Sequence, residues 1–354
     1  MGPKRSFISI KMNLPYHPEI SISKLSAVFR NTSATYKFYW FWSILEAVED
    51  SKIKIDKKEI FARMLSLAWY PVNYFHLSFG MQDLIEEAIL KVKDLERFNI
   101  DDKRKIIYDR LNKSSNPQTN QLLNHFDKNV PHKFLSPWLG SGSKSSTYLA
   151  SLNSTNEAPY SLFKDHIVIS DNWWHYFYNN TAVLKAFCYW NLSLFLQSRN
   201  PNVPDIPNKI HRPIVRGSLS NHKTKFWDHV IEEMGTVHGI YTGNKIEKGN
   251  YAIEHFIPHQ FVAHDLMWNL IPADSTFNSI KSDKLPRFDV YFDSFYNFQK
   301  LGVEVIKQIS PKNHYLQDYL PIFPDLEIDK YKFEEHIKPM LTIAHNNGFQ
   351  YLDV

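Results

Sequence analysis

Two stretches of the sequence decide how its central region folds: YAIEHFIP over residues 251–258 and NLIPADSTFNSIKSDKLP over residues 269–286. The first is a short apolar run that Pro258 ends, which predicts a β-strand. In the second, Asp274 is a favourable N-cap and Pro286 stops helix formation, so we predict a short helix between them. A strand and a short helix therefore flank a loop in the middle of this segment.

A second strand is expected just upstream. Residues 237–242 form another apolar run, and the turn signals Gly243-Asn244 and Gly249-Asn250 separate it from residues 251–257. Such turn pairs between two apolar runs are typical of a β-hairpin. We therefore predict the order strand, strand, loop, short helix, with the two strands paired to each other.

The predicted strand and helix carry four residues that together indicate a specific chemistry: Glu254, His255, Asn278 and Lys281. Neighbouring strand residues point to opposite sides, so Glu254 and His255 would flank a ligand. Asn278 and Lys281 are three residues apart and share one helix face. Histidine titrates near neutral pH and can take a proton from water, while carboxylate and amide oxygens suit Mg²⁺ or Mn²⁺. Together these groups favour metal-assisted phosphodiester hydrolysis.

The order Glu-His-x-x-Pro, Asn-Leu, Asn-x-x-Lys-Ser-Asp-x-x-Pro resembles the HNH (ββα-metal) endonuclease motif over about residues 237–286. It is particularly similar to the HNH domain of Cas9-type nucleases. The resemblance implies that Glu254 and Asn278 are metal ligands, His255 the general base, Asn269 the residue that orients the histidine, and Lys281 a lysine facing the phosphate. The family usually has Asp where this chain has Glu254.

The resemblance implies a stand-alone bacterial endonuclease that cuts double-stranded DNA with Mg²⁺ or Mn²⁺, in restriction or antiviral defence. Cutting both strands would need two sites, which would call for a homodimer or a defence-system partner protein. Two alternatives stay open. The HNH core could be degenerate and serve a DNA-binding subunit, or the same site could cut RNA.

Composition sets the broader frame. The 354 residues are 43% hydrophobic, 22% charged and 15% aromatic, with only 11 glycines, which is typical of a globular protein rich in helices. A net charge of +4 permits nucleic-acid binding without requiring it. The one cysteine, Cys188, has no intramolecular disulfide partner. No apolar run is long enough for a membrane span and no signal core begins the chain, so we expect a cytoplasmic protein without membrane contact.

Helical spacing dominates on both sides of the motif, which predicts a mainly helical α+β protein carrying a small ββα nuclease core. We expect a helical N-terminal domain (1–200), a basic connector (201–225), the HNH core (226–290) and C-terminal helices that pack on it (291–354). The connector and the end of the core carry seven basic residues that we predict to bind DNA phosphates: Lys209, Arg212, Arg216, Lys223, Lys225, Lys284 and Arg287.

A glycine- and serine-rich run, GSGSKSS over residues 140–146, superficially suggests a phosphate loop. It lacks the second-glycine spacing of the pattern G-x-x-x-x-G-K-[ST], and no apolar strand precedes it. We therefore expect an ordinary loop there.

Overall fold

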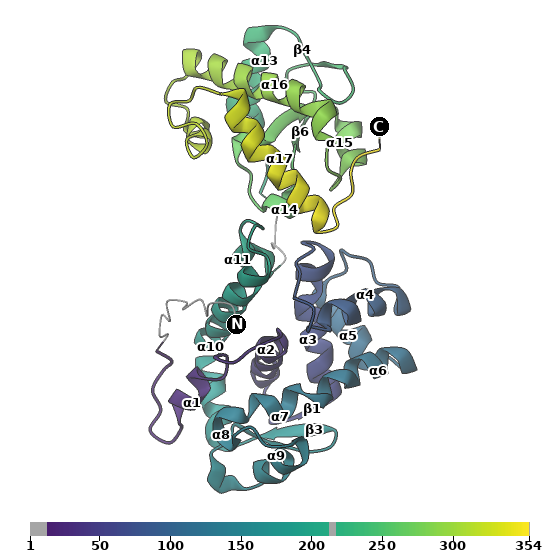
Figure 1. The fold of residues 1–354 in the computed structure, drawn as a ribbon, viewed down its shortest axis with the longest axis vertical. Coiled ribbons are helices and arrows are strands. Elements are labelled where there is room, and N and C mark those ends of the chain that lie inside the picture. The colour runs from purple at the N-terminus through teal and green to yellow at the C-terminus, as the bar shows by residue number, and fades with distance from the viewer. Residues whose placement is uncertain (1–12, 212–216, 354) are drawn as a thin grey trace, which may run out of the picture. The chain divides into compact units, whose positions relative to one another are not determined.

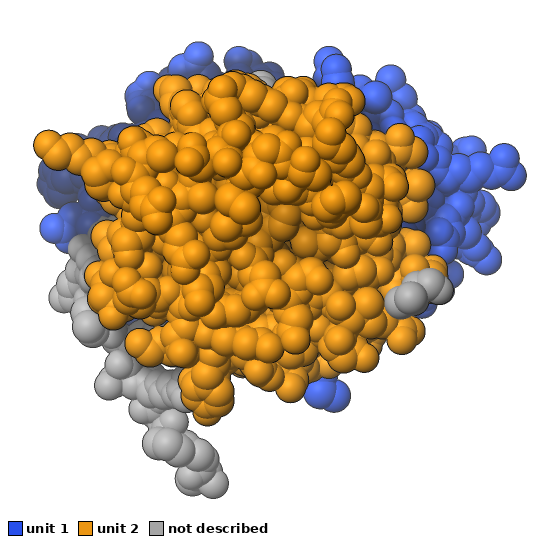
Figure 2. Space-filling model, turned by 90° about the horizontal axis from the view of Figure 1, so that it is seen from above, with its two compact units in different colours: residues 1–200 blue, residues 201–354 orange. Residues whose placement is uncertain are grey.

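The computed structural model describes residues 13–211 and 217–353, and the chain divides into two compact units, Met1–Asn200 and Pro201–Val354, which Figure 2 colours separately. Both units are mainly helical, and their described residues form three small antiparallel sheets. The predicted class, a mainly helical α+β protein, is confirmed.

Unit 1 is built around three long helices, α2 (Tyr36–Glu49), α3 (Lys57–Asn73) and α10 (Asp171–Arg199) (Figure 1). Almost every side chain of α2 and α3 is buried, which explains why these segments are apolar all round instead of on one stripe. Shorter helices surround them: α1 (Ile22–Ser26), α4 (Ile85–Leu95), α5 (Arg104–Lys113), α6 (Pro117–His125), α7 (Val130–Phe134), α8 (Ser136–Leu139) and α9 (Lys144–Ser151).

A three-stranded sheet in unit 1 was not predicted. Its strands are β1 (Lys54–Asp56), β2 (Tyr160–Leu162) and β3 (His166–Ile169), with β3 in the middle and antiparallel to both neighbours. Strands of three or four residues show too little alternation to be recognised, and β1 is separated from its partner by several helices. The glycine–serine run forms a loop only up to Ser143, which caps α9 by accepting a hydrogen bond from the Ser146 amide.

A helix near the start of unit 2 contains a π-helical turn. Ser220–His222 (α12), Lys223–Trp227 (the π turn) and Asp228–Met234 (α13) follow one another without a break. The turn packs on α16 (Phe288–Ile309) at Gly302, where a Cβ atom would lie 3.0 Å from the Trp227 ring. Glycine is required there because the two helices approach too closely for a side chain.

The predicted hairpin is wrong in its pairing. Residues 252–255 form β6 (Ala252–His255), which pairs with β7 (Leu270–Ala273), whereas β4 (Val237–His238) pairs with β5 (Lys245–Ile246). Pro272 is the reason that β7 escaped prediction, since proline within an apolar run argues against a strand. Short helices α14 (His259–Val262) and α15 (Ser275–Lys281) and a 3₁₀ turn (Met267–Asn269) complete this region.

C-terminal helices pack on the β6–β7 pair: α16 contacts both β7 and α17 (Lys330–Asn346). Figure 1 shows α16 and α17 near β6. The rings of Phe256 and Phe295 stack with centroids 3.8 Å apart, and the Gln299 amide donates to the Leu270 carbonyl at 2.9 Å. These contacts give the small strand pair the hydrophobic support that it cannot supply alone. In the described parts of the chain, every helix is too short or too polar to cross a membrane.

Candidate active site

The two most buried residues of strand β6 have titratable side chains. Glu254 is 2% exposed and His255 is 5% exposed, and they lie opposite Ile271 and Leu270 of β7. Successive strand residues point to opposite faces, so each has its own set of partners. Burial of such groups costs free energy unless they are paired, and both are paired here.

His255 is paired with Asp265, a residue that the sequence analysis missed. The ring Nε2 lies 2.8 Å from the Asp265 carboxylate, which comes from the loop after α14. The Nε2 of His259 lies 3.9 Å from the same carboxylate oxygen. An ionised carboxylate only accepts hydrogen bonds, so the pairing with Asp265 favours a proton on Nε2 of His255, and in the neutral ring the basic nitrogen is then Nδ1.

Only one signal in the sequence pointed to this aspartate. Asp265 is the sole acidic residue between Glu254 and Asp274. The loop that carries it has no periodicity, however, so nothing in the pattern places it beside the His255 ring.

Glu254 forms a buried ion pair with Lys281, the last residue of α15. The Lys281 Nζ lies 2.5 Å from the Glu254 carboxylate and donates to the His255 carbonyl at 2.9 Å. Lys281 is fully buried. We predicted this lysine to face a phosphate, but in the structure its ammonium group neutralises Glu254 and ties α15 to β6.

Asn269 acts on the main chain next to the histidine. Its side-chain oxygen accepts from the Ile257 amide and its side-chain nitrogen donates to the Ile257 carbonyl, each at 2.8 Å. Its own carbonyl accepts from the Phe256 amide at 2.8 Å. These contacts of Asn269 fix the backbone that follows His255, while Asp265 contacts the ring itself.

Asn278 lies on α15, one turn before Lys281, and is half-buried. The helix begins as predicted, with the Asp274 carboxylate accepting from the Phe277 amide at 2.9 Å. Because residues three apart share a helix face, Asn278 lies on the face through which Lys281 reaches β6.

The donor set fits an oxygen-seeking divalent cation. Glu254 and Asn278 supply a carboxylate and an amide oxygen, and Mg²⁺ commonly uses one or two carboxylates with water completing its shell. Within residues 13–211 and 217–353, no cluster of three or more His, Cys, Asp and Glu side chains could hold a metal ion. An ion bound at Glu254 would have to share that carboxylate with the Lys281 ammonium group.

The seven basic residues predicted to bind DNA phosphates fall into different settings. Arg212 and Arg216 lie outside the described residues. The prediction is wrong for Lys209, which is fully buried, donates to the Pro204 carbonyl and has its pKa lowered by burial to about 7. Lys223 donates to the Gly249 and Tyr251 carbonyls at 2.8 and 2.6 Å.

The remaining three are accessible to a ligand. Lys225 and Arg287 are exposed, and Lys284 is half-buried with its ammonium group 3.5 Å from the Asp353 carboxylate. Because their side chains reach solvent, these three residues remain candidates for contacts with DNA phosphates.

Comparison with known proteins finds a family match in the same segment of the chain. Residues 239–287 match the family model described as HNH endonuclease. The match runs from the residue after β4 to the residue that precedes α16, and it includes Glu254, His255, Asn269, Asn278 and Lys281. Neither the curated proteins nor the solved structures gave a match. The chain carries an HNH endonuclease domain within unit 2, and it is a nuclease of the hydrolase class.

Proposed function

We propose that this protein is a divalent-metal-dependent endonuclease that hydrolyses phosphodiester bonds of double-stranded DNA. The observation that carries the proposal is the His255–Asp265 pair, 2.8 Å apart, on the strand that also presents Glu254. A histidine whose Nε2 proton is held by a carboxylate offers Nδ1 as a general base at neutral pH.

In the proposed reaction, Nδ1 of His255 takes a proton from a water molecule whose oxygen attacks the phosphorus. The bond from phosphorus to the 3′ oxygen breaks, and the departing oxygen takes up a proton from solvent. By the family resemblance, the products carry 5′-phosphate and 3′-hydroxyl ends. The chemistry that a bound divalent cation supplies is neutralisation of charge on the departing oxygen, with Glu254 and Asn278 as its proposed ligands.

Asn269 and Lys281 act in this proposal as positioning residues. Asn269 keeps the backbone after His255 in place, and Lys281 holds α15, with Asn278, against β6. The exposed cations Lys225 and Arg287, together with Lys284, are the proposed contacts to the DNA backbone.

Plasmid cleavage tests the proposal directly. We expect wild-type protein to cut plasmid with Mg²⁺ or Mn²⁺ and to stop when EDTA is added. His255→Ala should lose about 10²–10⁴-fold in rate, the range for a general base. His229→Ala, an exposed histidine on α13, is the matched control and should cut normally. Equal cleavage by His255→Ala would refute the assignment of the base.

One observation favours a second candidate, a DNA-binding subunit with a degenerate core. Glu254 replaces the usual aspartate, and its carboxylate already contacts the Lys281 ammonium group. In that case plasmid would be bound but left intact with every divalent ion. Parallel digestion of single-stranded RNA identifies an RNA endonuclease, and sedimentation of the cutting species shows whether a dimer cuts both strands.

A role in bacterial restriction or antiviral defence, in the cytoplasm, is part of the proposal because it fits a stand-alone HNH enzyme of this size. Cells expressing the wild-type chain should then resist infection by some phages, whereas cells expressing His255→Ala should not. Equal plaque counts across a broad phage panel would exclude the defence role while leaving the nuclease proposal intact.

A further inference from the structure

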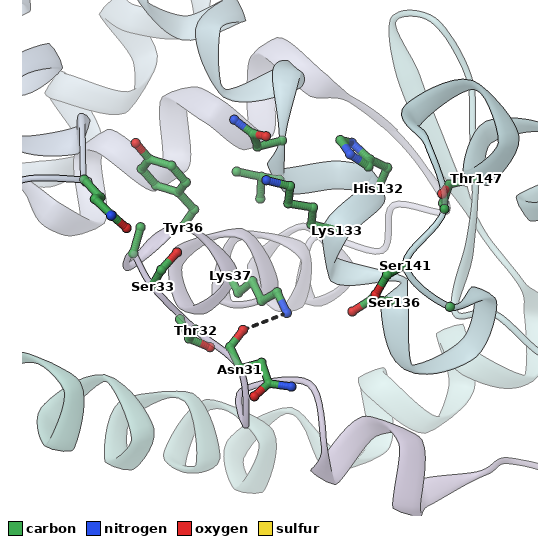
Figure 3. A pocket seen from close by; sticks show the side chains of 16 residues that line it. Asn31, Thr32, Ser33, Tyr36, Lys37, His132, Lys133, Ser136, Ser141 and Thr147 are labelled. Atoms are coloured by element: carbon green, nitrogen blue, oxygen red, sulfur yellow. Dashed lines mark hydrogen bonds between the residues drawn. The ribbon is translucent and has the colours of Figure 1, made fainter. Parts of the chain in front are cut away.

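A pocket of about 540 Å³ lies within unit 1, and the proposed nuclease chemistry does not use it. Its walls come from the segment that enters α2, from α7 and α8, and from the loop before α9. Figure 3 shows Lys37 and Lys133 in the middle of the pocket, with Thr32 and Ser33 on one side and Ser136, Ser141 and Thr147 on the other. The volume is in the range of small-molecule sites and far exceeds that of one small ion.

The lining of the pocket is cationic and rich in hydroxyl groups. It contains two lysines and His132, together with five serine and threonine side chains, and it includes no aspartate or glutamate. Lys133 is exposed and makes no ion pair within the described residues, so its charge is available to a ligand. Ser33, Ser136 and Ser141 also offer hydroxyl groups that no described residue engages.

The charge of Lys133 disfavours further positive charge on the other basic groups of the pocket. Lys37 is partly buried and its pKa is lowered by burial and by the charge of Lys133. His132 is 8% exposed, and its Nδ1 is buried without a hydrogen-bond partner. Burial and the charges of Lys133 and Lys144 lower its pKa as well. Burying basic groups close to one another, with one ring nitrogen unpaired, costs free energy of folding. A bound anion would reduce this cost by neutralising the charge and accepting hydrogen bonds.

Two glycines determine the backbone path of the glycine–serine loop at the wall of the pocket. Gly140 has φ +73°, which residues with a Cβ atom rarely adopt, and a Cβ on Gly142 would lie 2.7 Å from the Ser146 hydroxyl. The two glycines let the loop fold closely onto α9 while it forms one wall of the pocket. The run that superficially suggested a phosphate loop thus lies beside two lysines, although it lacks the nucleotide-binding pattern.

We propose that this pocket binds a phosphorylated small molecule of nucleotide size. Phosphate oxygens accept several hydrogen bonds at once, which matches a site with two ammonium groups, an imidazole and several hydroxyls. The remaining volume takes the uncharged body of the ligand, against Tyr36 and Val130. This site is separate from the nuclease residues in the sequence and would bind its ligand whether or not unit 2 cuts DNA.

Calorimetric titration of the full chain tests the proposal. The probes are adenosine monophosphate, inorganic phosphate, citrate and uncharged adenosine, without divalent metal. We expect the monophosphate to bind, phosphate to compete with it, and adenosine to give no heat. Binding of citrate in place of both phosphate compounds, or no binding by any phosphate compound, would overturn the proposal.

Two substitutions at exposed positions locate the site. Lys133→Gln and Ser141→Asp should each weaken monophosphate binding about tenfold or more, because one removes a cation and the other adds a repelling carboxylate. Lys128→Gln removes an exposed charge nearby that does not line the pocket, and it should bind like wild type. His255→Ala should also bind like wild type. Unchanged affinity in both pocket variants, with normal thermal unfolding, would overturn the assignment.

Discussion

The two units bury charged side chains in different ways. In unit 1, the Arg63 guanidinium lies among three carboxylates, with nitrogen–oxygen distances of 3.6 Å to Glu46, 2.5 Å to Asp50 and 3.0 Å to Glu59. In unit 2, Glu254 pairs with the ammonium group of Lys281, and His255 pairs with the carboxylate of Asp265.

We infer that the Arg63 network only stabilises the fold, whereas the two pairs of unit 2 also serve the proposed reaction. The Arg63 network links α2 and α3 through several partners, so it stabilises the packing of these two helices. The pairs in unit 2 sit on adjacent, buried residues of a four-residue strand. Burying two paired polar groups there is costly, and hydrophobic replacements of such pairs are often neutral or stabilising. We therefore infer that the proposed reaction, more than stability, accounts for their presence.

Breaking the ion pair of each unit should produce the largest effect and the clearest contrast. Lys281→Met removes the ammonium group that lies against the buried Glu254 carboxylate, and we expect a loss of about 3–5 kcal/mol in the free energy of unfolding. Arg63→Met should cost about 3 kcal/mol, since Lys52 and Arg104 still pair with its carboxylates.

Magnesium distinguishes the two variants. A cation that binds Glu254 only in the folded state should restore about 2–3 kcal/mol to Lys281→Met at one hundred times its dissociation constant. It should do nothing for Arg63→Met. Urea unfolding with and without excess Mg²⁺ measures both. An equal magnesium response in the two variants would remove the proposed distinction between the two units.

Asp265→Asn is expected to give the next largest effect, on rate. Without the carboxylate, the proton of the His255 ring is no longer held on Nε2. Loss of a residue that orients a functional histidine in this way typically lowers activity by about 10–100-fold. Asp265 is one-quarter exposed, so the free energy of unfolding should change by about 1 kcal/mol or less.

Unit 1 offers a matched control for this substitution. Asp165 contacts the His166 ring at 2.7 Å but is largely exposed. Asp165→Asn makes the same change in a second His–Asp pair and should leave plasmid cleavage unchanged. If both variants cut at the wild-type rate, Asp265 is not a positioning residue.

The sequence predicted the parts of this site that follow from local pattern. The β6 strand, the Asp274 cap and the α15 helix each depend on a few neighbouring residues, and each appears where it was expected. The partner of β6 was mispredicted because Pro272 disguises β7. Asp265 and the buried pairing of Lys281 were missed because they depend on contacts between segments that carry no shared pattern. The same reason explains why the unit 1 sheet and pocket were not foreseen.

Close helix packing predicts a smaller effect that should be confined to stability. Gly302→Ala places a Cβ atom 3.0–3.1 Å from the Trp227 and Phe226 rings, so α16 and the π turn must move apart. Overpacking of this kind costs about 1–3 kcal/mol. Thermal unfolding should show the loss, while the cleavage rate per folded molecule should stay near wild type. A large fall in that rate would mean that α16 also positions the nuclease residues.

The smallest expected effect comes from helix caps, one in each unit. Asp274 caps α15 and Asn116 caps α6, each through a backbone amide at 2.9 Å. Replacement by alanine should cost about 1 kcal/mol in either case. Only α15 carries Asn278 and Lys281, however, so only Asp274→Ala should also slow plasmid cleavage, because the first turn of that helix frays. Equal cleavage by the two variants at equal stability would show that the α15 geometry tolerates a frayed start, and it would weaken the proposed role of Asn278.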